Sequence, residues 1–466
     1  MSSSISPASV DPAGGTAAPN VDAPTVQASP STVQREATRL SELSPQQWKS
    51  GIAAWLGWLF DGLDMHLYTL VAAPFVAVLL HSASPSSADV KEKSAFIQAA
   101  FLVGWALGGG FFGRLGDLLG RSRALSLTIL TYALFTGLSF FATEWWHLLI
   151  CRFLAALGIG GEWAVGSALL SETWPARWRA WIAAVLQTGV NLGVLLACGC
   201  VFVLANPATY EFLAGFFKDL PPNFYLRSVF LVGIVPALLV FWIRRHVPEP
   251  AEWTAAQARV SDERKPTMMD LFRGDVRRTT LLTIGVCATA LTGWWAFMFW
   301  SLQHLGGLAK QAGMPDGARD QFTAVAFLWV IGISILGNFF ASGIARKIGY
   351  RNAVAVMCFL FIVTLVATYY KPRGHEELRM WMPIVGFCSG VMGLFTMYLP
   401  PLFPTLLRTT GAGFSYNIGR IVAAAGTVIF AFVVKDLDLR LALLGVSALF
   451  VPAMLIALKM PDLRDK

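Results

Sequence analysis

Runs of apolar residues as long as a membrane-spanning helix recur along the chain, with short polar segments between them. A bilayer core of ~30 Å is crossed by about 20 apolar residues in a helix. Twelve such runs can be marked, so the pattern predicts an all-α membrane protein with twelve transmembrane helices. The runs lie near 50–80, 95–113, 124–142, 147–170, 180–204, 225–243, 279–303, 321–343, 352–370, 381–403, 411–434 and 440–459.

Composition agrees with this prediction. Hydrophobic residues make up 55% of the 466-residue chain and charged residues only 14%, whereas soluble domains carry about 25% charged residues. All six cysteines fall inside the apolar runs, and no Cys or His spacing is typical of a metal site. We therefore expect neither a disulfide framework nor a bound metal or other cofactor.

The apolar runs divide the chain into two sets of six. The first residues are rich in Ser, Ala, Pro and Thr, a composition that does not fold, and they lack the basic start and apolar stretch of a signal peptide. The expected organisation is a disordered cytoplasmic tail over 1–44, a six-helix bundle over 45–243, a cytoplasmic linker loop over 244–278, a second six-helix bundle over 279–459 and a short cytoplasmic tail over 460–466.

Positive charge predicts the orientation of these helices. The two tails and the alternate loops on their side hold roughly twice as many Lys and Arg residues as the opposite side. We therefore place both termini in the cytoplasm, in a protein of the cell membrane that we expect to act as a monomer. Because the basic residues behind the net charge of +8 are spread over many loops, a nucleic-acid partner is not indicated.

Two similar glycine-containing segments, Gly113–Arg123 and Gly343–Arg351, follow the second and eighth runs. Placing Gly120 on Gly349 requires an offset of 229 residues. At that offset two further pairs of residues coincide in later loops, Pro175 with Pro404 and Arg179 with Arg408. The sixth and twelfth runs also end alike, at a shorter offset, in Val247–Pro250 and Met460–Leu463. Repeated halves are typical of transporters, whose substrate site lies near the midplane between them.

These residues resemble the major facilitator superfamily over nearly all of the chain. Gly113–Arg123 is similar to its loop signature G-x-L-x-D-x-x-G-R between two spans, and Arg152–Gly161 to its R-x-x-x-G-x-G pattern. More narrowly, four segments resemble the sialate and metabolite:proton symporters: Asp61–Asp64, Gly160–Pro175, Phe403–Arg408 and Asn417–Arg420. The first of these is also similar to the aromatic acid:proton symporters. The resemblance implies transport by alternating access and, from these branches, coupling to protons.

The first repeated loop has residues suited to gating. Its glycines allow helix ends to approach closely, and Asp117 can cap a helix or pair with a nearby Arg when the cytoplasmic side is closed. Glu172 could pair with Arg121 or Arg123. The second copy has Arg346 where Asp117 would lie, so the same latch is not assured there. The gating residues that we expect are Gly113, Asp117, Gly120, Arg121, Arg123, Glu172, Arg179 and Arg408.

Two carboxyl groups lie within the first apolar run. At 1.5 Å per residue, Asp61 is ~16 Å inside the run, near the midplane, and Asp64 follows one turn later on the same face. Two carboxylates this close in a low dielectric are not expected to ionise together. Proton coupling is therefore the leading role of Asp61 and Asp64; a structural hydrogen bond or a pair with an Arg is the alternative. His66, on another face, is expected to pack or to line the pore.

Further charges lie in the fourth and eleventh runs. Arg420 is ~14 Å inside the eleventh run, and its planar guanidinium suits a carboxylate. It is expected to anchor a substrate carboxylate, unless it forms a permanent ion pair with Asp61 or Asp64. Arg152 lies only ~8 Å from the outer end of the fourth run, which suits a proton relay or an outer gate. Glu162, halfway along that run, is a relay residue or a packing residue.

The repeat does not duplicate these charges. At the 229-residue offset, Asp61 falls on Ala290 and Arg420 falls on Asn191. Because scaffold residues repeat and membrane charges do not, we expect acids in the first half and a substrate-binding cation in the second. Polar and aromatic residues that could complete the site are Asn417, Tyr416, Gln187, Asn191, Trp294, Trp295 and His66.

The leading hypothesis is a proton-coupled symporter of a small organic anion, with the anion, protons and the lipid bilayer as partners. Protonation of Asp61 or Asp64 would offset the substrate charge and release Arg420 to bind it. The fifth run lacks the Gly-Pro pair of proton antiporters, and the seventh lacks the signature of fungal lactate permeases. Val247–Pro250 is reminiscent of the sugar porters, so a sugar or polyol porter is the alternative, and a solute receptor is a third. An enzyme is least supported, since no nucleophile–base pair, metal cluster or phosphate loop is found.

Overall fold

The computed structural model describes residues 37, 39–82, 87–204, 206, 208–209, 211–212, 224–260, 265–434 and 438–463. The chain divides into two units, Met1–Ala37 and Thr38–Lys466, and the described helices belong to the second. Most of the tail predicted over 1–44 lies outside the described residues. Within the described part, a 3-10 turn at Leu40–Glu42 precedes the first long helix.

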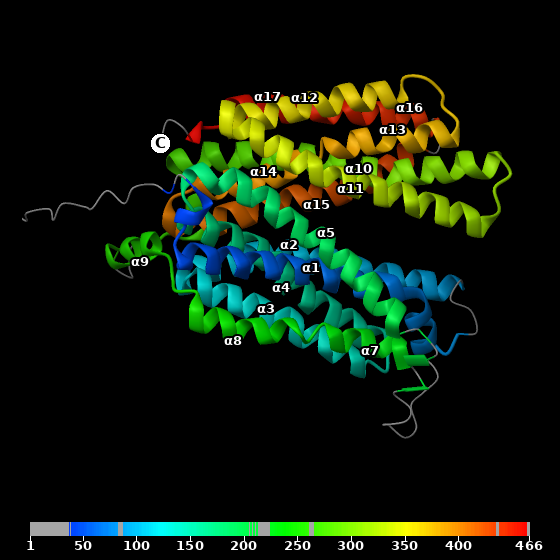
Figure 1. Ribbon diagram of the computed structural model, residues 1–466, viewed down its shortest axis with the longest axis horizontal. Helices are drawn as coiled ribbons and strands as arrows, with labels where there is room; N and C mark the ends of the chain where they lie inside the picture. Colours follow the sequence, from blue (N-terminus) through cyan, green and yellow to red (C-terminus); the bar gives the residue numbers. More distant parts are fainter. Residues whose placement is uncertain are drawn as a thin grey trace, which may run out of the picture. The chain divides into compact units, whose positions relative to one another are not determined.

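The first half of the second unit contains six segments that are long and apolar enough to cross a membrane, and Figure 1 shows how their helices are arranged. Its helices are α1 (Pro45–Leu79), α2 (Ala88–Leu119), α3 (Arg121–Leu138), α4 (Trp145–Thr173) and α5 (Ala176–Leu204), followed by α7 (Phe224–Val232) and α8 (Pro236–His246), which together form the sixth span. The segment predicted as a linker loop contains a short helix, α9 (Ala251–Ala258), and a 3-10 turn at Met268–Phe272.

The second half also contains six spans. Its helices are α10 (Gly274–Gln311), α11 (Asp316–Ile348), α12 (Tyr350–Tyr369), α13 (His375–Phe387) with α14 (Gly390–Tyr398), α15 (Arg408–Val434), and α16 (Leu439–Val446) with α17 (Phe450–Lys459). Among the described residues, 11 helical segments are long and apolar enough to cross a membrane, and α15 supplies the twelfth span. The predicted all-α fold of twelve spans is confirmed.

Most helices extend a few residues beyond the apolar runs that predicted them, because polar residues at their ends continue the helix. At the start of α1, for example, the hydroxyl of Ser44 accepts a hydrogen bond from the N–H of Gln47, and Pro45 occupies the first helical position. Both features are favourable at a helix amino terminus.

Helices pack in the same way in both halves. In the first half α1 packs against α5, α2 against α4 and α3 against α8; in the second, α10 packs against α15, α11 against α13 and α14, and α12 against α17. Between the halves, the second span of each half packs against the fifth span of the other, α2 against α15 and α11 against α5. The packing therefore has the two-fold pattern that the sequence repeat predicts.

Single glycines end the second span of each half. Gly120 has a φ of 104° and Gly349 a φ of 85°, in the region of backbone conformations that favours glycine. In each case the same glycine directly precedes the next helix, which begins at Arg121 or at Tyr350. The offset that aligns the two loops in the sequence thus aligns the same backbone turn in the structure.

Small residues bring the two halves together along α2 and α15. A Cβ atom at Gly413 would lie 2.4 Å from the carbonyl oxygen of Gly109, and one at Gly113 would lie 2.9 Å from the carbonyl oxygen of Thr409. A larger side chain at these positions would push the helices apart. Such close backbone approach is typical of helix interfaces within membranes.

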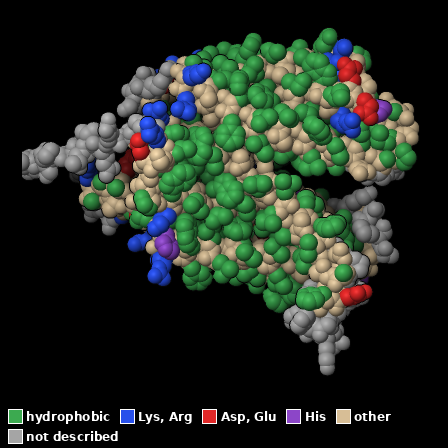
Figure 2. All heavy atoms as spheres, in the orientation of Figure 1, with side chains coloured by type: hydrophobic (Ala, Val, Ile, Leu, Met, Phe, Trp, Pro, Cys, Tyr) green, Lys and Arg blue, Asp and Glu red, His purple; other side chains and the backbone are tan. Residues whose placement is uncertain are grey.

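Hydrophobic side chains cover most of the face shown in Figure 2, and Lys and Arg side chains gather near the end where α9 lies. This distribution suits a bilayer around the helices, with the charged groups at its interfaces. Figure 2 also shows a furrow between the two halves at the opposite end. The halves therefore meet most closely at the α9 end.

Candidate functional site

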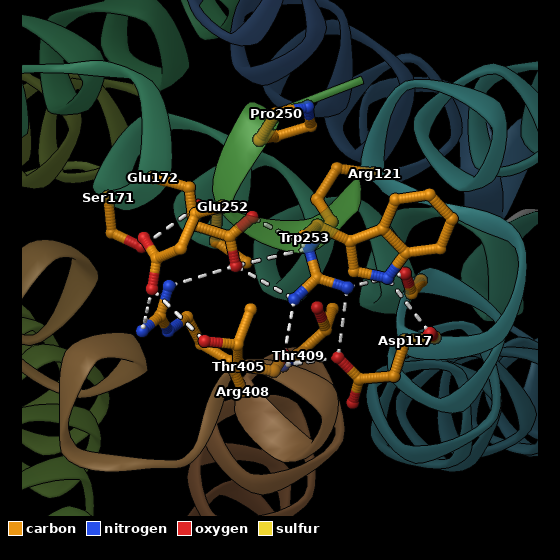
Figure 3. Close-up of polar contacts among 12 residues, drawn as sticks. Asp117, Arg121, Ser171, Glu172, Pro250, Glu252, Trp253, Thr405, Arg408 and Thr409 are labelled. Atoms are coloured by element: carbon orange, nitrogen blue, oxygen red, sulfur yellow. Dashed lines mark hydrogen bonds and ion pairs between the residues drawn. The ribbon is translucent and has the colours of Figure 1, made fainter. Parts of the chain in front are cut away.

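A dense group of charged side chains joins the two halves at the α9 end (Figure 3). Glu172, near the end of α4, accepts hydrogen bonds from Arg121 at Nη2 (2.8 Å) and Nε (3.0 Å), and from Nη1 of Arg408 at 3.0 Å. The side chains of Arg121 and Glu172 are fully buried. One carboxylate thus binds a guanidinium from its own half and another from the opposite half.

Asp117 caps the first turn of α15 in the opposite half. Its carboxylate accepts hydrogen bonds from the backbone N–H groups of Thr409 (3.2 Å) and Thr410 (2.8 Å), and lies 3.1 Å from the Arg121 guanidinium. Arg121 also donates to the carbonyl oxygen of Thr405 at 2.6 Å. First-turn N–H groups of a helix lack helical partners and carry partial positive charge, which a carboxylate satisfies. Asp117 therefore acts both as a helix cap and as a partner of an Arg.

The helix α9 adds a third set of contacts. Glu252 lies 2.8 Å from Nη2 of Arg408 and accepts a hydrogen bond from the Thr405 hydroxyl at 3.0 Å. Burial favours the neutral form of Glu252, but the hydrogen bond and charge of Arg408 outweigh burial and hold the pKa of this carboxyl below its ordinary value. The indole N–H of Trp253 donates to the Asp117 carbonyl oxygen at 3.0 Å. The segment predicted as a loop thus closes over the charged group.

We refer to five of these residues together as the latch: Asp117, Arg121, Glu172, Glu252 and Arg408. Of the two partners foreseen for Glu172, the structure contains Arg121. The backbone N–H of Arg123 instead donates to the carboxylate of Glu249 at 3.0 Å. Arg179 donates from Nε to the carbonyl oxygen of Trp174 at 3.1 Å.

The second copy of the loop is built differently. Arg346, at the position equivalent to Asp117, is exposed, and its guanidinium lies 5.6 Å from the centroid of the Trp178 ring on α5. Tyr350, which follows the second glycine, stacks on Tyr398 with ring centroids 5.6 Å apart. Within the described part of the chain, only the first copy contributes an acid to the contact between the halves at this end.

A second buried group lies inside the first half. Arg152 on α4 lies 3.3 Å from Asp64 on α1, and the Thr136 hydroxyl on α3 donates to the carboxylate while it accepts from the guanidinium. All three side chains are buried, and the guanidinium lies 5.5 Å from the centroid of the Phe230 ring. Breaking a buried ion pair by removing one partner is costly, so Arg152 holds Asp64 firmly.

Asp61 and Glu162 are two further buried carboxyl groups in this half. Neither oxygen of Glu162, nor Oδ1 of Asp61, has a hydrogen-bond partner among the described residues. Gly57, one turn before Asp61, makes room for Glu162, because a Cβ atom there would lie 1.6 Å from Oε1. Two ionised carboxylates are both acceptors, whereas a single proton between them would supply the missing hydrogen bond.

Arg420, on α15, lies among aromatic rings. Its guanidinium is 3.7 Å from the centroid of the Trp105 ring and 5.0 Å from that of Tyr416. Nη1 donates to Oδ1 of Asn417 at 3.0 Å. Tyr416 stacks in turn on Trp163, with centroids 4.0 Å apart and planes 14° apart. These contacts fix the orientation of the guanidinium without neutralising its charge.

The ion pair of Arg420 with Asp61 or Asp64, left open by the sequence, is not formed. Arg152 holds Asp64, and no carboxylate among the described residues forms an ion pair with Arg420. Trp163, which follows Glu162 on α4, stacks on the Tyr416 ring that the Arg420 guanidinium contacts. The acids of the first half and the cation of the second half therefore lie in one region without neutralising each other.

The other predicted site residues differ in their surroundings. Asn191 on α5 has a buried Nδ2 atom with no hydrogen-bond partner, and Gln187, one turn earlier, is half-buried. Nδ1 of His66 lies 2.9 Å from the Gly62 carbonyl oxygen of its own helix. Trp295 on α10 is 40% exposed. Among the described residues, no group of three His, Cys, Asp or Glu side chains could hold a metal ion.

Comparison with known proteins decides the family. Residues 50–268 match the family model described as sugar (and other) transporter. The chain is 30% identical to a putative metabolite transport protein of Haemophilus influenzae. The alignment spans 434 residues and covers 90% of this chain and 97% of that protein. The chain belongs to the major facilitator superfamily.

Other members of the superfamily agree with this assignment. The sialic acid transporter NanX of Escherichia coli is 26% identical, over 91% of this chain and 96% of that protein. The solved structure of the proton:xylose symporter XylE superposes with a TM-score of 0.64 at 17% identity, covering 90% of this chain and 96% of that chain. The likeness to XylE shows that the fold is the twelve-helix fold of the superfamily.

Sequence reasoning missed several residues that contact the buried charges. Thr136 and Trp105 lie on spans whose interiors carry no charge, and no local pattern distinguished them from other polar and aromatic residues. Gly57 had a usable signal, since it precedes Asp61 by four residues and therefore lies on the same helix face. A glycine one turn from a membrane carboxylate indicates that another group approaches the helix there.

Proposed function

We propose that this member of the superfamily is a proton-coupled symporter of a small organic anion, a carboxylate in particular. The observation that carries the proposal is Arg420, a guanidinium stacked on Trp105 inside the membrane-spanning part, with no carboxylate partner among the described residues. An unpaired cation in a membrane interior is costly, so its retention favours a counter-ion that comes from outside the chain. The planar fork of Arg suits a carboxylate.

The proposed proton site is the pair Asp61 and Glu162. Because both oxygens of Glu162 and Oδ1 of Asp61 lack hydrogen-bond partners, the pair gains most from holding a proton between its two members. Loading a further proton would neutralise the pair and weaken its attraction for Arg420, leaving the guanidinium free for the substrate. Asp64 and Arg152, already paired, are proposed to couple this change to the packing of α1 against α4.

The relatives support an organic anion as substrate. One of them transports sialic acid, which is an organic acid. The matching family model, by contrast, is that of sugar and other transporters, so a neutral sugar or polyol is the second candidate. The buried charges favour the anion, because a neutral substrate gives Arg420 no counter-ion.

We propose alternating access as the mechanism, with the latch as its inner gate. The Lys and Arg excess predicts that the α9 end and both termini face the cytoplasm. In this orientation the contacts of Glu172 and Asp117 close the cytoplasmic side, and the furrow between the halves opens on the other side. We propose that a single chain carries out the cycle.

Uptake by the purified chain in liposomes tests the proposal. An acidic exterior should drive accumulation of a labelled carboxylate above its equilibrium level, and other carboxylates should compete where sugars do not.

Asp61→Asn should abolish uphill accumulation while leaving exchange of preloaded substrate, because exchange needs no net proton transfer. Arg420→Lys, which keeps the charge but loses the fork, should raise KM.

Three results would contradict the proposal. Competition by sugars alone would favour the sugar porter, and specific binding without any flux would favour a solute receptor. Unchanged uphill accumulation by Asp61→Asn would remove the proton site.

A further inference from the structure

An aromatic cavity lies between α1 and α5 near the latch. It has a volume of about 170 Å³. Its lining is almost entirely apolar and consists of Trp48, Gly51, Ile52, Trp55, Trp174, Trp181, Ile182 and Val185. Gly51 leaves space beside one of the indoles, since a Cβ atom there would lie 2.7 Å from the Trp174 ring. Neither the proton site nor the latch uses this cavity.

The cavity is accessible from outside the helices. Trp174, at its inner wall, is 1% exposed, whereas Trp48 and Ile52 at its rim are 37% and 44% exposed. Because α1 and α5 are membrane-spanning helices, the surface at this rim faces lipid. An engineered apolar cavity of about 150 Å³ stays dry and binds benzene, so an apolar lining of this size favours a hydrocarbon group over water. The natural occupant is therefore a hydrocarbon chain of a lipid.

A chain of ring contacts leads from the cavity to a cation. The rings of Trp174 and Trp181 have centroids 6.3 Å apart, and those of Trp181 and Trp178 are 6.2 Å apart. Arg346 lies over the Trp178 ring at 5.6 Å. Within the described part of the chain, no carboxylate pairs with this exposed guanidinium. A positive charge thus lies one ring contact and one cation–π contact from Trp181 in the cavity lining, at the end of the helices where headgroups lie.

We propose that an anionic phospholipid binds here, with an acyl chain in the tryptophan cavity and its phosphate on Arg346. The cavity supplies hydrocarbon contacts and Arg346 supplies the charge that a phosphate needs. Arg346 belongs to the second half, and the tryptophans belong to the first. The bound lipid therefore bridges the halves and stabilises their contact at the α9 end. This inference goes beyond the proposed transport function and does not depend on which substrate is carried.

Native mass spectrometry of the full chain in nonionic detergent tests the binding. The probes are dioleoyl phosphatidylglycerol, which is anionic, and dioleoyl phosphatidylcholine, which has no net charge. We expect one saturable phosphatidylglycerol site. Arg346→Gln should weaken its binding about five-fold, because the loss of one basic residue weakens attraction to an anionic lipid by about that factor. Lys347→Gln is the matched control, because it removes a neighbouring exposed charge that has no ring contact with Trp178.

A second variant tests the acyl chain. Val185→Phe fills part of the cavity and should weaken binding of both lipids, whatever their headgroup. If this variant does not fold, Ile52→Phe at the rim of the cavity serves the same purpose. Glycerol 3-phosphate, which has the phosphate but no chain, should not compete at concentrations where the lipid binds.

Several outcomes would overturn the proposal. Equal weakening by Arg346→Gln and Lys347→Gln would reveal unspecific attraction to a charged surface. Full competition by glycerol 3-phosphate would show that the site binds the phosphate alone. Unchanged lipid binding in both cavity variants would show that the acyl chain does not occupy the cavity. None of these results bears on carboxylate uptake, so failure here leaves the proposed function untouched.

Discussion

The two copies of the repeated loop share a backbone but differ in chemistry. In both, one glycine with positive φ ends one helix and precedes the next. In both, an acidic residue that follows the last span of the half reaches the start of the helix after the glycine. Glu249 accepts from the backbone N–H of Arg123 at 3.0 Å, and Asp462 lies 3.6 Å from Arg351. The scaffold of the turn is therefore duplicated.

The contact with the opposite half is not duplicated. Asp117 of the first copy binds backbone N–H groups at the start of α15, whereas Arg346 of the second copy lies over an aromatic ring of α5. The first loop therefore binds the opposite half through hydrogen bonds, and Arg408 of the opposite half adds ion pairs with Glu172 and Glu252 beside that loop. Two related halves are held together by an asymmetric latch.

The starts of the two helices explain the difference. At the repeat offset Thr409 corresponds to Ala180. Because α15 begins at Arg408, the N–H of Thr409 lies in the first turn, where N–H groups lack helical partners. Because α5 begins at Ala176, the N–H of Ala180 lies beyond the first turn and has a helical partner. An acid at position 346 would find no free N–H group to bind, and the aromatic ring of α5 suits Arg346 better.

Among the changes that test this difference between the two loops, removal of the Glu172 carboxylate should lower the thermal unfolding midpoint most. Glu172→Gln removes one of the two carboxylates of the buried Arg121, which keeps Asp117, and one of the two of Arg408, which keeps Glu252. Breaking a buried pair from one side costs about 3–5 kcal/mol. We expect a large fall in the thermal unfolding midpoint of the purified protein. Spin labels at positions 123 and 347, measured by pulsed EPR, should show a broader distance distribution across the α9 end.

The corresponding change beside the second copy is Asp462→Asn, which removes the carboxylate 3.6 Å from Arg351. The side chain of Asp462 is 4% exposed and that of Arg351 is 32% exposed, and an ion pair with a partly exposed member contributes about 1 kcal/mol. The unfolding midpoint should fall only slightly, with an unchanged distance distribution. Equal losses for Glu172→Gln and Asp462→Asn would mean that the two loops contribute equally to the contact.

Alanine at the two glycines tests the shared turn. Gly120→Ala and Gly349→Ala should each cost about 1–2 kcal/mol, because both residues have positive φ. Gly120→Ala should cost more, since its Cβ atom would also lie 2.4 Å from the Glu249 carboxyl carbon. Chemical unfolding of both variants checks the order. A greater loss for Gly349→Ala would contradict this account of the first turn.

Loss of the charge on Asp117 should have a smaller effect than loss of Glu172. Asp117→Asn keeps the shape of the side chain but weakens the cap on α15, for which the helix-terminus interaction is about 1–2 kcal/mol. The midpoint should fall moderately and the label distances should broaden less than in Glu172→Gln. Substrate KM should stay unchanged, because Asp117 lies in the latch and Arg420 is several turns further along α15. A raised KM without any fall in the midpoint would contradict a role in gating.

Much of the fold could be predicted from the sequence. Long apolar runs mark membrane helices without knowledge of their packing, and a constant offset marks a repeat. The buried charges were found for a similar reason, since ionisable residues within spans are few. Their pairing could not be predicted. Asp61 and Asp64 share one helix face, and only the rotation of α4 decides that Arg152 pairs with Asp64 while Glu162 lies against Gly57, one turn before Asp61.

The latch could be predicted only in part. Asp117 and Glu172 belong to recognisable segments, whereas Glu252 joins the latch through a contact with Arg408, which is distant in the sequence. The segment that contains Glu252 has no long apolar run, so the sequence predicted a loop where the structure has α9. A helix this short depends on its tertiary contacts, which a local pattern does not contain.

Reversal of the charge at position 346 should change the unfolding midpoint least. It is also the most direct test of the explanation that the starting points of α5 and α15 decide which residue each loop carries. If the missing acid alone accounted for the asymmetry, Arg346→Asp would create a second latch and raise the unfolding midpoint about as much as Asp117→Asn lowers it. Because α5 offers no free N–H group there, we expect no gain. In detergent without anionic lipid, the loss should be that of an exposed cation–π contact, about 0.5–1 kcal/mol. A gain would show that the helix start does not decide which residue the loop carries.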